Sequence, residues 1–392
     1  MIVSGLLIAS ALATSTGNNL ERTNVSIMRC SIETGWLSTN IDQRVSLAVA
    51  GRLNGHATQV MIDTGAPRTT ISTRLADALR IPYTIGKSRS FLNAIADTFE
   101  GGEVEIELGE FAKYKQKVEV VDFKYFQVLN IPIDLVIGRD LLKNCMFSYD
   151  RKSRRIKISD DVDSSEFKAV KLFDDNGDNF LYTSVVISDG ENIKSYIDTG
   201  SASSYKITSD RNASQIVGND VKITTVPISS LVSVSIEEIA IIPQIFIDNS
   251  PIYNLTVNFA QTTPKNGEKN PTVGLIGRGV LERFSFIVDF KNKKLFIDDE
   301  VQNPPNIIKS TSGLVVIPVL NNLSVIHVMR NSPAERAGWK LGAQICAVDG
   351  QEIPKNYRES SLRRWTIDAP GRKVLLKLCN GETRTLTLEE FY

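Results

Sequence analysis

An internal repeat limits the fold of this chain more than any other feature of its sequence. The letters Ile-Asp-Thr-Gly occur at 62–65 and again at 197–200, each time at the end of an apolar segment. In both places a β-rich hairpin comes before them, with turn residues at 54–55 in the first copy and at 189–190 in the second. The chain therefore places an aspartate twice in a tight turn at the end of a predicted strand.

A second landmark recurs at nearly the same distance. Ile-Gly-Arg follows an apolar strand at 137–139 and at 276–278, and its glycine lies 75 residues after the aspartate in the first copy (63 to 138) and 79 in the second (198 to 277). Matching spacing of two independent landmarks indicates a tandem duplication of a β-rich unit of about 130 residues, the size of one domain. We predict a mainly β protein with a first lobe at 30–160 and a second lobe at 161–300.

Composition narrows the range of functions. The chain has 392 residues, and its 45 basic and 45 acidic side chains give no electrostatic reason to expect a nucleic-acid partner. It has two histidines and no Cys-x-x-Cys pair, so we expect no metal site and no cofactor. Four cysteines allow three disulfide pairings, among which the sequence does not choose: Cys30, Cys145, Cys346 and Cys379.

The N-terminal segment has the features of a secretory signal. Residues 2–13 are apolar or small and end in Ala-Leu-Ala, which suits a cleavage site. We predict a signal peptide at 1–16 and export to the periplasm or the cell exterior, with 17–40 as the candidate for a propeptide. The apolar run is too short to span a bilayer, and we expect no transmembrane span. The alternatives are a buried first strand or a misassigned start, since no Lys or Arg precedes the run.

The two Asp-Thr-Gly turns carry the candidate chemistry. One such turn alone is commonly structural, because Asp and Gly both favour turns. Two related units packed about a pseudo-two-fold axis would bring Asp63 and Asp198 together, and adjacent carboxyls share one proton. The charged member can take a proton from water, while the neutral member donates a hydrogen bond to the carbonyl oxygen of a substrate amide. The pair thus predicts hydrolysis of peptide bonds without a metal or a covalent intermediate.

Both halves resemble aspartic proteases of the retropepsin type, whose subunit carries Asp-Thr-Gly-Ala and a later strand ending in Ile-Gly-Arg. The matching stretches are MIDTGA with LVIGRDLL, and YIDTGS with GLIGRGVL. Two fused lobes of this kind resemble the pepsin-like arrangement. The resemblance implies a bilobal acid-protease fold, a polypeptide substrate in extended conformation, and Asp63 and Asp198 as the catalytic pair. It also implies support for the pair from Thr64, Gly65, Thr199 and Gly200, and from the Ile-Gly steps at 137–138 and 276–277, with Arg139 and Arg278 structural.

The same resemblance implies a flap, a hairpin that covers the active site and lies between the two landmarks. In the first lobe the candidate is 93–106, in which Gly101 and Gly102 would give mobility. In the second lobe the flap is hard to place, and the candidate segment is 225–241.

The C-terminal module at 307–392 follows a linker-like Asn-Pro-Pro at 303–305. It resembles a PDZ domain of the bacterial protease-associated kind through Ser-Pro-Ala at 332–334, Ala-Gly at 337–338 and Asp-Gly at 349–350. The resemblance implies that a peptide C-terminus binds there, with its carboxylate on a loop near 312–316. The alternative is a small structural cap on the lobes.

Two other functions are weaker hypotheses. A serine protease is disfavoured because the chain has no Gly-x-Ser-x-Gly and both His56 and His327 lie in predicted strands as ordinary residues. A non-catalytic peptide-binding protein that keeps the fold is the main alternative, but it has no physical need for intact Thr and Gly in both copies. The sequence therefore favours an aspartic-type endopeptidase.

Overall fold

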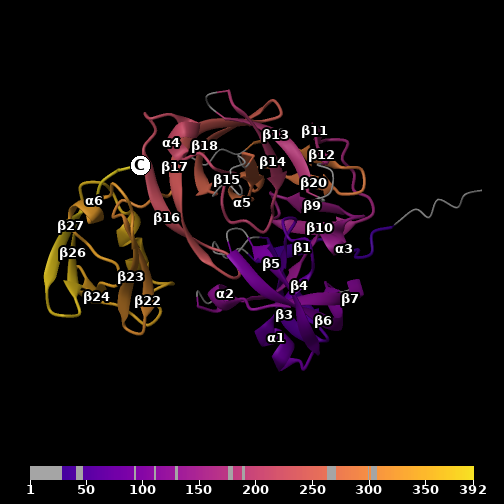
Figure 1. The fold of residues 1–392 in the computed structure, drawn as a ribbon, viewed down its shortest axis with the longest axis horizontal. Coiled ribbons are helices and arrows are strands. Elements are labelled where there is room, and N and C mark those ends of the chain that lie inside the picture. The colour runs from indigo at the N-terminus through magenta and orange to yellow at the C-terminus, as the bar shows by residue number, and fades with distance from the viewer. Residues whose placement is uncertain are drawn as a thin grey trace, which may run out of the picture.

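The computed structural model describes residues 29–40, 47–91, 94–109, 112–128, 131–174, 180–187, 190–262, 271–298, 300–301 and 307–392. The signal peptide predicted at 1–16 and the linker at 303–305 lie outside these residues. Strands dominate the described chain and its helices are short, so the prediction of a mainly β protein is confirmed (Figure 1). No helix among these residues is long and apolar enough to cross a bilayer.

The first lobe contains ten strands and three short helices among its described residues. The strands are β1 (Leu37–Asn40), β2 (Ala48–Leu53), β3 (His56–Ile62), β4 (Thr70–Ser72), β5 (Tyr83–Phe91), β6 (Ala94–Leu108), β7 (Ala112–Val121), β8 (Ile133–Ile137), β9 (Met146–Asp150) and β10 (Arg155–Ser159). The helices are α1 (Thr73–Ala78), α2 (Lys124–Val128) and α3 (Arg139–Leu142).

The second lobe is built in the same way. Its strands are β11 (Lys168–Lys171), β12 (Phe173–Asp174), β13 (Leu181–Ile187), β14 (Asn192–Ile197), β15 (Tyr205–Ser209), β16 (Ile223–Ser229), β17 (Val234–Ile247), β18 (Ser250–Gln261), β19 (Val273–Ile276), β20 (Phe286–Asp289) and β21 (Lys294–Ile297). Its helices are α4 (Ala213–Val217) and α5 (Arg278–Leu281).

The strand order of the second lobe repeats that of the first. One sheet contains the run β2-β3-β8-β4-β7-β6-β5, and the other contains β13-β14-β19-β15-β18-β17-β16. The cross-pairing of β2 with β6 also recurs, between β13 and β17. In each lobe the strand that ends at the aspartate pairs in parallel with the strand that ends in Ile-Gly, which are β3 with β8 and β14 with β19. The equivalent turns therefore occupy equivalent places in the two sheets.

A shared sheet joins the lobes. It continues the first-lobe sheet beyond β2 in the order β1-β10-β9-β20-β21-β11, and β20 of the second lobe pairs antiparallel with β9 of the first. Phe147 and Phe286, with ring centroids 6.0 Å apart, pack at this junction inside one apolar core that extends through both lobes. A disulfide between Cys30 and Cys145 ties the N-terminal segment to the turn that follows α3.

Each lobe has a hairpin between its two landmarks, formed by β5 with β6 in the first lobe and by β16 with β17 in the second. The second-lobe hairpin contains the whole candidate flap segment at 225–241. In the first lobe Gly101 and Gly102 lie inside β6 at a register shift against β7, and the mobility expected from them stays a prediction. Gly101 is needed there for space, since a Cβ would lie 2.9 Å from Val118 O on β7.

The C-terminal module is a separate sheet with its own core. Its elements are β22 (Leu314–Val319), β23 (Asn322–Val328), α6 (Pro333–Arg336), β24 (Gln344–Val348), β25 (Gln351–Glu352), the 3-10 helix η1 (Ser361–Ile367), β26 (Lys373–Leu378) and β27 (Thr383–Thr387). Ser332 caps α6 by accepting a hydrogen bond from Glu335 N. A second disulfide joins Cys346 to Cys379, so the structure selects one of the three possible pairings.

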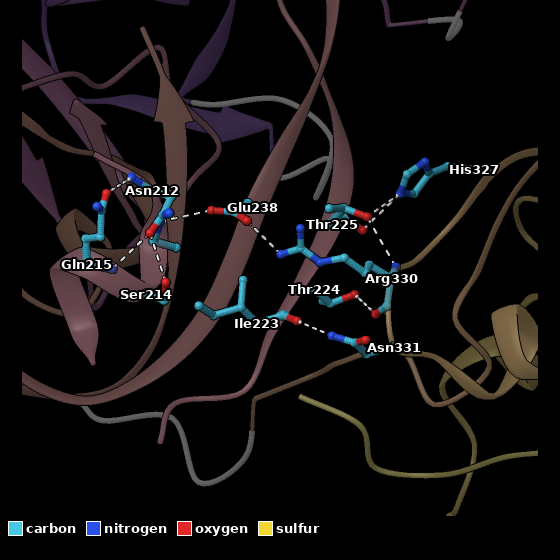
Figure 2. Close-up of polar contacts among 11 residues, drawn as sticks. Asn212, Ser214, Gln215, Ile223, Thr224, Thr225, Glu238, His327, Arg330 and Asn331 are labelled. Atoms are coloured by element: carbon cyan, nitrogen blue, oxygen red, sulfur yellow. Dashed lines mark hydrogen bonds and ion pairs between the residues drawn. The ribbon is translucent and has the colours of Figure 1, made fainter. Parts of the chain in front are cut away.

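The C-terminal module docks on the second-lobe hairpin, beside β16 (Figures 1 and 2). Thr224 Oγ1 donates to Arg330 O at 2.6 Å, and Thr225 Oγ1 lies 2.9 Å from His327 Nε2. The guanidinium of Arg330 also forms an ion pair with Glu238 on β17 at 2.6 Å. The module therefore contacts both strands of the hairpin.

The loop predicted to hold a peptide carboxylate bonds within its own module. Two of the N–H groups at 311–314 donate to Thr366 O at 3.0 and 3.2 Å. The other two donate to the hydroxyls of Ser310 and Ser312 at 3.0 and 3.1 Å. All four donors are engaged in this conformation, and binding of a peptide C-terminus at 312–316 stays a prediction.

Candidate active site

The two Asp-Thr-Gly turns meet between the lobes. Each turn begins at the end of a strand that lies beside the Ile-Gly strand in the sheet: Asp63 N donates to Ile137 O and Asp198 N donates to Ile276 O, both at 3.0 Å. The carboxyl groups of the two aspartates form a hydrogen bond with each other. The structure thus brings together the two residues that the repeat singles out.

The backbone of each turn orients its own carboxyl group. Asp63 Oδ1 accepts hydrogen bonds from the N–H groups of residues 65 and 66 at 2.7 and 3.0 Å. Asp198 Oδ1 accepts from the N–H groups of residues 200 and 201 at 2.9 and 3.1 Å. The matching geometry follows from the repeated sequence and places the carboxyls symmetrically.

Glycine is required in both turns because the opposite carboxyl takes the space of a side chain. A Cβ on Gly65 would lie 2.6 Å from Asp198 Cγ, and a Cβ on Gly200 would collide with Asp63 Cγ. Neither glycine has a positive φ, so close approach and not backbone conformation explains the residue type.

The two threonines cross-link the turns through four reciprocal hydrogen bonds. Thr64 N donates to Thr199 Oγ1 and Thr199 N donates to Thr64 Oγ1, both at 3.0 Å. Each hydroxyl also donates across the axis at 2.8 Å, Thr64 to Ile197 O and Thr199 to Ile62 O. Both side chains are buried, so these bonds fix one lobe against the other at the position of the aspartates.

The Ile-Gly-Arg segments pack against the Asp-Thr-Gly turns, and the arginine of this segment has different partners in the two lobes. Gly138 packs on the chain after the first turn, where a Cβ would lie 2.5 Å from the Arg68 carbonyl carbon. Arg139 donates from Nη1 to Thr64 O and Gly65 O, both at 2.9 Å, and its guanidinium lies 3.8 Å from the Phe180 ring centroid. Its counterpart Arg278 lies 3.7 Å from Glu282.

The surroundings of the two carboxyls affect their pKa values to different extents. Burial, followed by the charge and hydrogen bond of Asp63, raises the pKa of Asp198 well above its ordinary value of 3.8. Burial also raises the pKa of Asp63, but hydrogen bonds from Gly65 N and from Asp198, together with the nearby Arg139 charge, oppose that rise. We therefore expect the pair to share one proton, with Asp198 as the member that holds it.

These pKa shifts predict how stability depends on pH. Because the folded protein keeps the Asp198 proton at pH values where the unfolded chain has lost it, stability falls as pH rises above about 3.8. Asparagine has no such proton, so we expect the difference in unfolding free energy, Asp198→Asn minus wild type, to be more positive at pH 7 than at pH 4. Urea unfolding at both pH values measures this, and an equal difference at the two would contradict it.

A cleft of about 920 Å³ extends over the aspartates between the lobes. Leu231 and Val232, at the tip of the second-lobe hairpin, pack on an apolar cluster of the first lobe that includes Met61 and Phe123. The C-terminal module also reaches the cleft, through Arg358. The hairpin thus contacts the first lobe at its tip and the C-terminal module along its strands.

The cleft lining includes several polar residues that are not among the site residues predicted from the sequence, among them Lys206, Asn258 and Arg358, and Glu237 pairs with Lys206 beside it. The sequence carries no clear signal for them, since the strands of Lys206 and Asn258 contain other polar residues as well. Among the residues that the structure describes, no three His, Cys, Asp or Glu side chains gather in a group suited to hold a metal ion.

Comparison with known proteins supports an aspartyl protease domain in the first lobe. Residues 49–141 match a family model described as aspartyl protease, a segment that includes Asp63 and the first Ile-Gly-Arg. The chain is also 31% identical over 109 residues, 28% of its length, to DNA damage-inducible protein 1 of Kluyveromyces lactis. It spans about a quarter (25%) of the length of that curated relative.

Proposed function

We propose that this protein is an aspartic-type endopeptidase that hydrolyses peptide bonds with the pair Asp63 and Asp198. The observation that carries the proposal is the hydrogen-bonded pair of carboxyls, oriented by two matching turns and cross-linked by Thr64 and Thr199. The family match over 49–141 supports protease activity independently of this geometry. The cleft above the pair has room for an extended polypeptide.

The two carboxyls divide the proton transfers. Asp63 is the ionised member and takes a proton from a water molecule, whose oxygen forms a bond to the substrate carbonyl carbon. Asp198 donates its proton toward the carbonyl oxygen and stabilises the charge that develops there. The tetrahedral intermediate, a gem-diol, then breaks its C–N bond as Asp63 returns the proton to the leaving nitrogen and Asp198 takes a proton back from one of the two hydroxyls. The products are a new carboxyl and a new amine.

This assignment predicts a bell-shaped pH dependence of kcat/KM for peptide cleavage. Activity requires one proton on the pair, so it falls at low pH, where both carboxyls are protonated, and at high pH, where Asp198 ionises. Because the pKa of Asp198 is raised well above 3.8, we expect the descending limb above the ordinary carboxyl range. Hydrolysis of a fluorogenic peptide across pH measures this.

We expect a metal chelator to leave the rate of peptide hydrolysis unchanged and a pepstatin-like inhibitor to lower it.

A non-catalytic peptide-binding protein with the same fold is the second candidate. It is favoured if peptides bind in the cleft and no cleavage occurs at any pH. The strict space requirement at Gly65 and Gly200 supports the enzyme instead, because it exists only to let the two carboxyls approach.

We extend the proposal to the rest of the chain. The lobes at 30–160 and 161–300 form the protease, and the PDZ-like C-terminal module at 307–392 binds peptide or regulates the enzyme through its contacts with β16 and β17. Export through the signal at 1–16 is supported by the two disulfides, which are typical of oxidising compartments.

A further inference from the structure

A buried polar cluster lies at the second-lobe wall of the cleft, where two of its members line the cleft and the third, Glu237, pairs with one of them. It consists of Lys206 on β15, Glu237 on β17 and Asn258 on β18, each no more than 3% exposed. Lys206 Nζ forms an ion pair with Glu237 Oε1, and Lys206 and Asn258 line the cleft wall. The three side chains are outside the hydrogen-bond network of the Asp-Thr-Gly turns.

The strand register places the three residues on one face of the sheet. Lys206 pairs with Asn258 across β15 and β18, and Asn258 pairs with Ile239 across β18 and β17. Glu237 is two residues from Ile239 on β17, so its side chain points to the same face. Glu237 and Asn258 are thus diagonal neighbours, a relation that puts Cα atoms about 7–8 Å apart.

Two buried atoms of the cluster are without a hydrogen-bond partner, Glu237 Oε2 and Asn258 Nδ2. One is an acceptor and the other a donor. A buried polar atom left unpaired is destabilising, and more so when it belongs to a charged group. A ligand that supplied one donor and one acceptor would remove both costs at once.

The first lobe has a different arrangement at the equivalent positions. Lys206 pairs with the residue before Ile276, and Thr70 pairs with the residue before Ile137. Thr70 is therefore the counterpart of Lys206, and Glu119, which pairs with Thr70 on β7, is the counterpart of Asn258. The cluster is confined to one half of an otherwise symmetric cleft. It would therefore contact a substrate residue on only one side of the scissile bond.

We propose that Lys206, Glu237 and Asn258 form a subsite for a carboxamide side chain, glutamine or asparagine, of the polypeptide substrate. Asn258 Nδ2 donates to the carboxamide oxygen, and the carboxamide N–H donates to Glu237 Oε2. Lys206 neutralises the opposite oxygen of Glu237 and holds that carboxylate in place. This inference rests on the proposed endopeptidase function, because it names a preference of the same cleft.

Other side chains match the cluster less well. A carboxylate would place negative charge against Glu237 Oε2, and an ammonium group would face the N–H groups of Lys206 and Asn258. A hydroxyl both donates and accepts, but from one atom on a shorter side chain. The carboxamide carries its donor and acceptor on separate atoms, as the two unpaired groups of the cluster require.

The test uses the full-length protein and a degenerate synthetic peptide library, with cleavage sites and rates read by mass spectrometry. At one position on one side of the scissile bond, we expect Gln or Asn to raise kcat/KM about 10–100-fold over Leu and over Glu. Each matched polar contact to the side chain stabilises the bound substrate enough to account for a ratio of this order. Equal cleavage of the Gln, Leu and Glu peptides would overturn the subsite and leave the endopeptidase proposal standing.

Two substitutions separate recognition from a structural role. Glu237→Gln turns the acceptor into a donor, so we expect the preference at that position to change from Gln to Glu. Asn258→Asp turns the donor into an acceptor and should abolish the preference for Gln, which keeps the test decisive if Glu237→Gln does not fold. A uniform loss of activity on all peptides in both variants would show a structural role only and overturn the subsite. The matched control is Glu119→Gln in the first lobe, expected to leave the preference at this position unchanged.

Binding distinguishes failure of the subsite from failure of the proposed function. The Asp63→Asn variant is titrated with fluorescein-labelled peptides that differ only in Gln, Leu or Glu at the chosen position, or at each position in turn if the library is not cut. Tighter binding of the Gln peptide without cleavage by the wild type would support the subsite and overturn the endopeptidase. Equal binding of all three without cleavage would overturn both.

Discussion

Replacing Asp63 or Asp198 by asparagine is expected to lower kcat/KM for peptide hydrolysis by a factor of about 10²–10⁴, the usual contribution of a positioned acid or base. The Asp63→Asn variant has no carboxylate to take the proton from water, and the Asp198→Asn variant has no acidic proton to donate toward the carbonyl oxygen. The substitution keeps the size of the side chain, so the two turns retain their packing. Steady-state hydrolysis of a fluorogenic peptide gives the ratio, and circular dichroism checks that the variants are folded.

The matched control is Asp163→Asn, which changes an exposed aspartate in the second lobe and is expected to retain full activity. Undiminished cleavage by both dyad variants would end the proposal that the pair is catalytic. A large loss in one variant and a small loss in the other would instead change the roles assigned to the two carboxyls.

The meeting of Asp63 and Asp198 is predictable from the sequence because a duplicated unit implies an axis between its copies. Each turn is determined locally by the four residues Ile-Asp-Thr-Gly. The Ile-Gly-Arg landmark at matched spacing indicates that the same neighbouring strand lies beside the turn in both lobes. The reciprocal hydrogen bonds of Thr64 and Thr199 follow from the same symmetry. In this chain, the features that belong to the repeat are the ones that sequence reasoning places correctly.

The features that differ between the lobes are not predictable in this way. Glu237 and Glu238 are adjacent in β17 and point to opposite faces, one to the buried cluster and one to Arg330 of the C-terminal module. Nothing in the sequence shows which glutamate faces inward, because that depends on the register of β17 against β18. The space requirement at Gly101 in β6 is not predictable for a similar reason, since it is set by the neighbouring strand β7.

Replacing Thr199 by valine should be the most destabilising of the conservative changes at the site. Valine fills the same volume but removes the acceptor for Thr64 N and the donor to Ile62 O, which leaves two buried backbone groups unpaired. At roughly 1–3 kcal/mol for each group, we expect the free energy of unfolding to fall by about 2–6 kcal/mol. Urea denaturation at the pH of maximum stability measures this loss.

Serine at the same position provides the matched control, because Thr199→Ser keeps the hydroxyl and loses only a methyl group. We expect it to recover most of the stability and nearly all of the activity, whereas Thr199→Val loses activity as the aspartates lose their alignment. If valine and serine have the same effect, the hydroxyl bonds across the axis contribute little, and the packing of the shared sheet at Phe147 and Phe286 would have to hold the lobes in register. In that case the carboxyls would keep their hydrogen bond without the threonines, and their alignment would depend on the whole interface between the lobes.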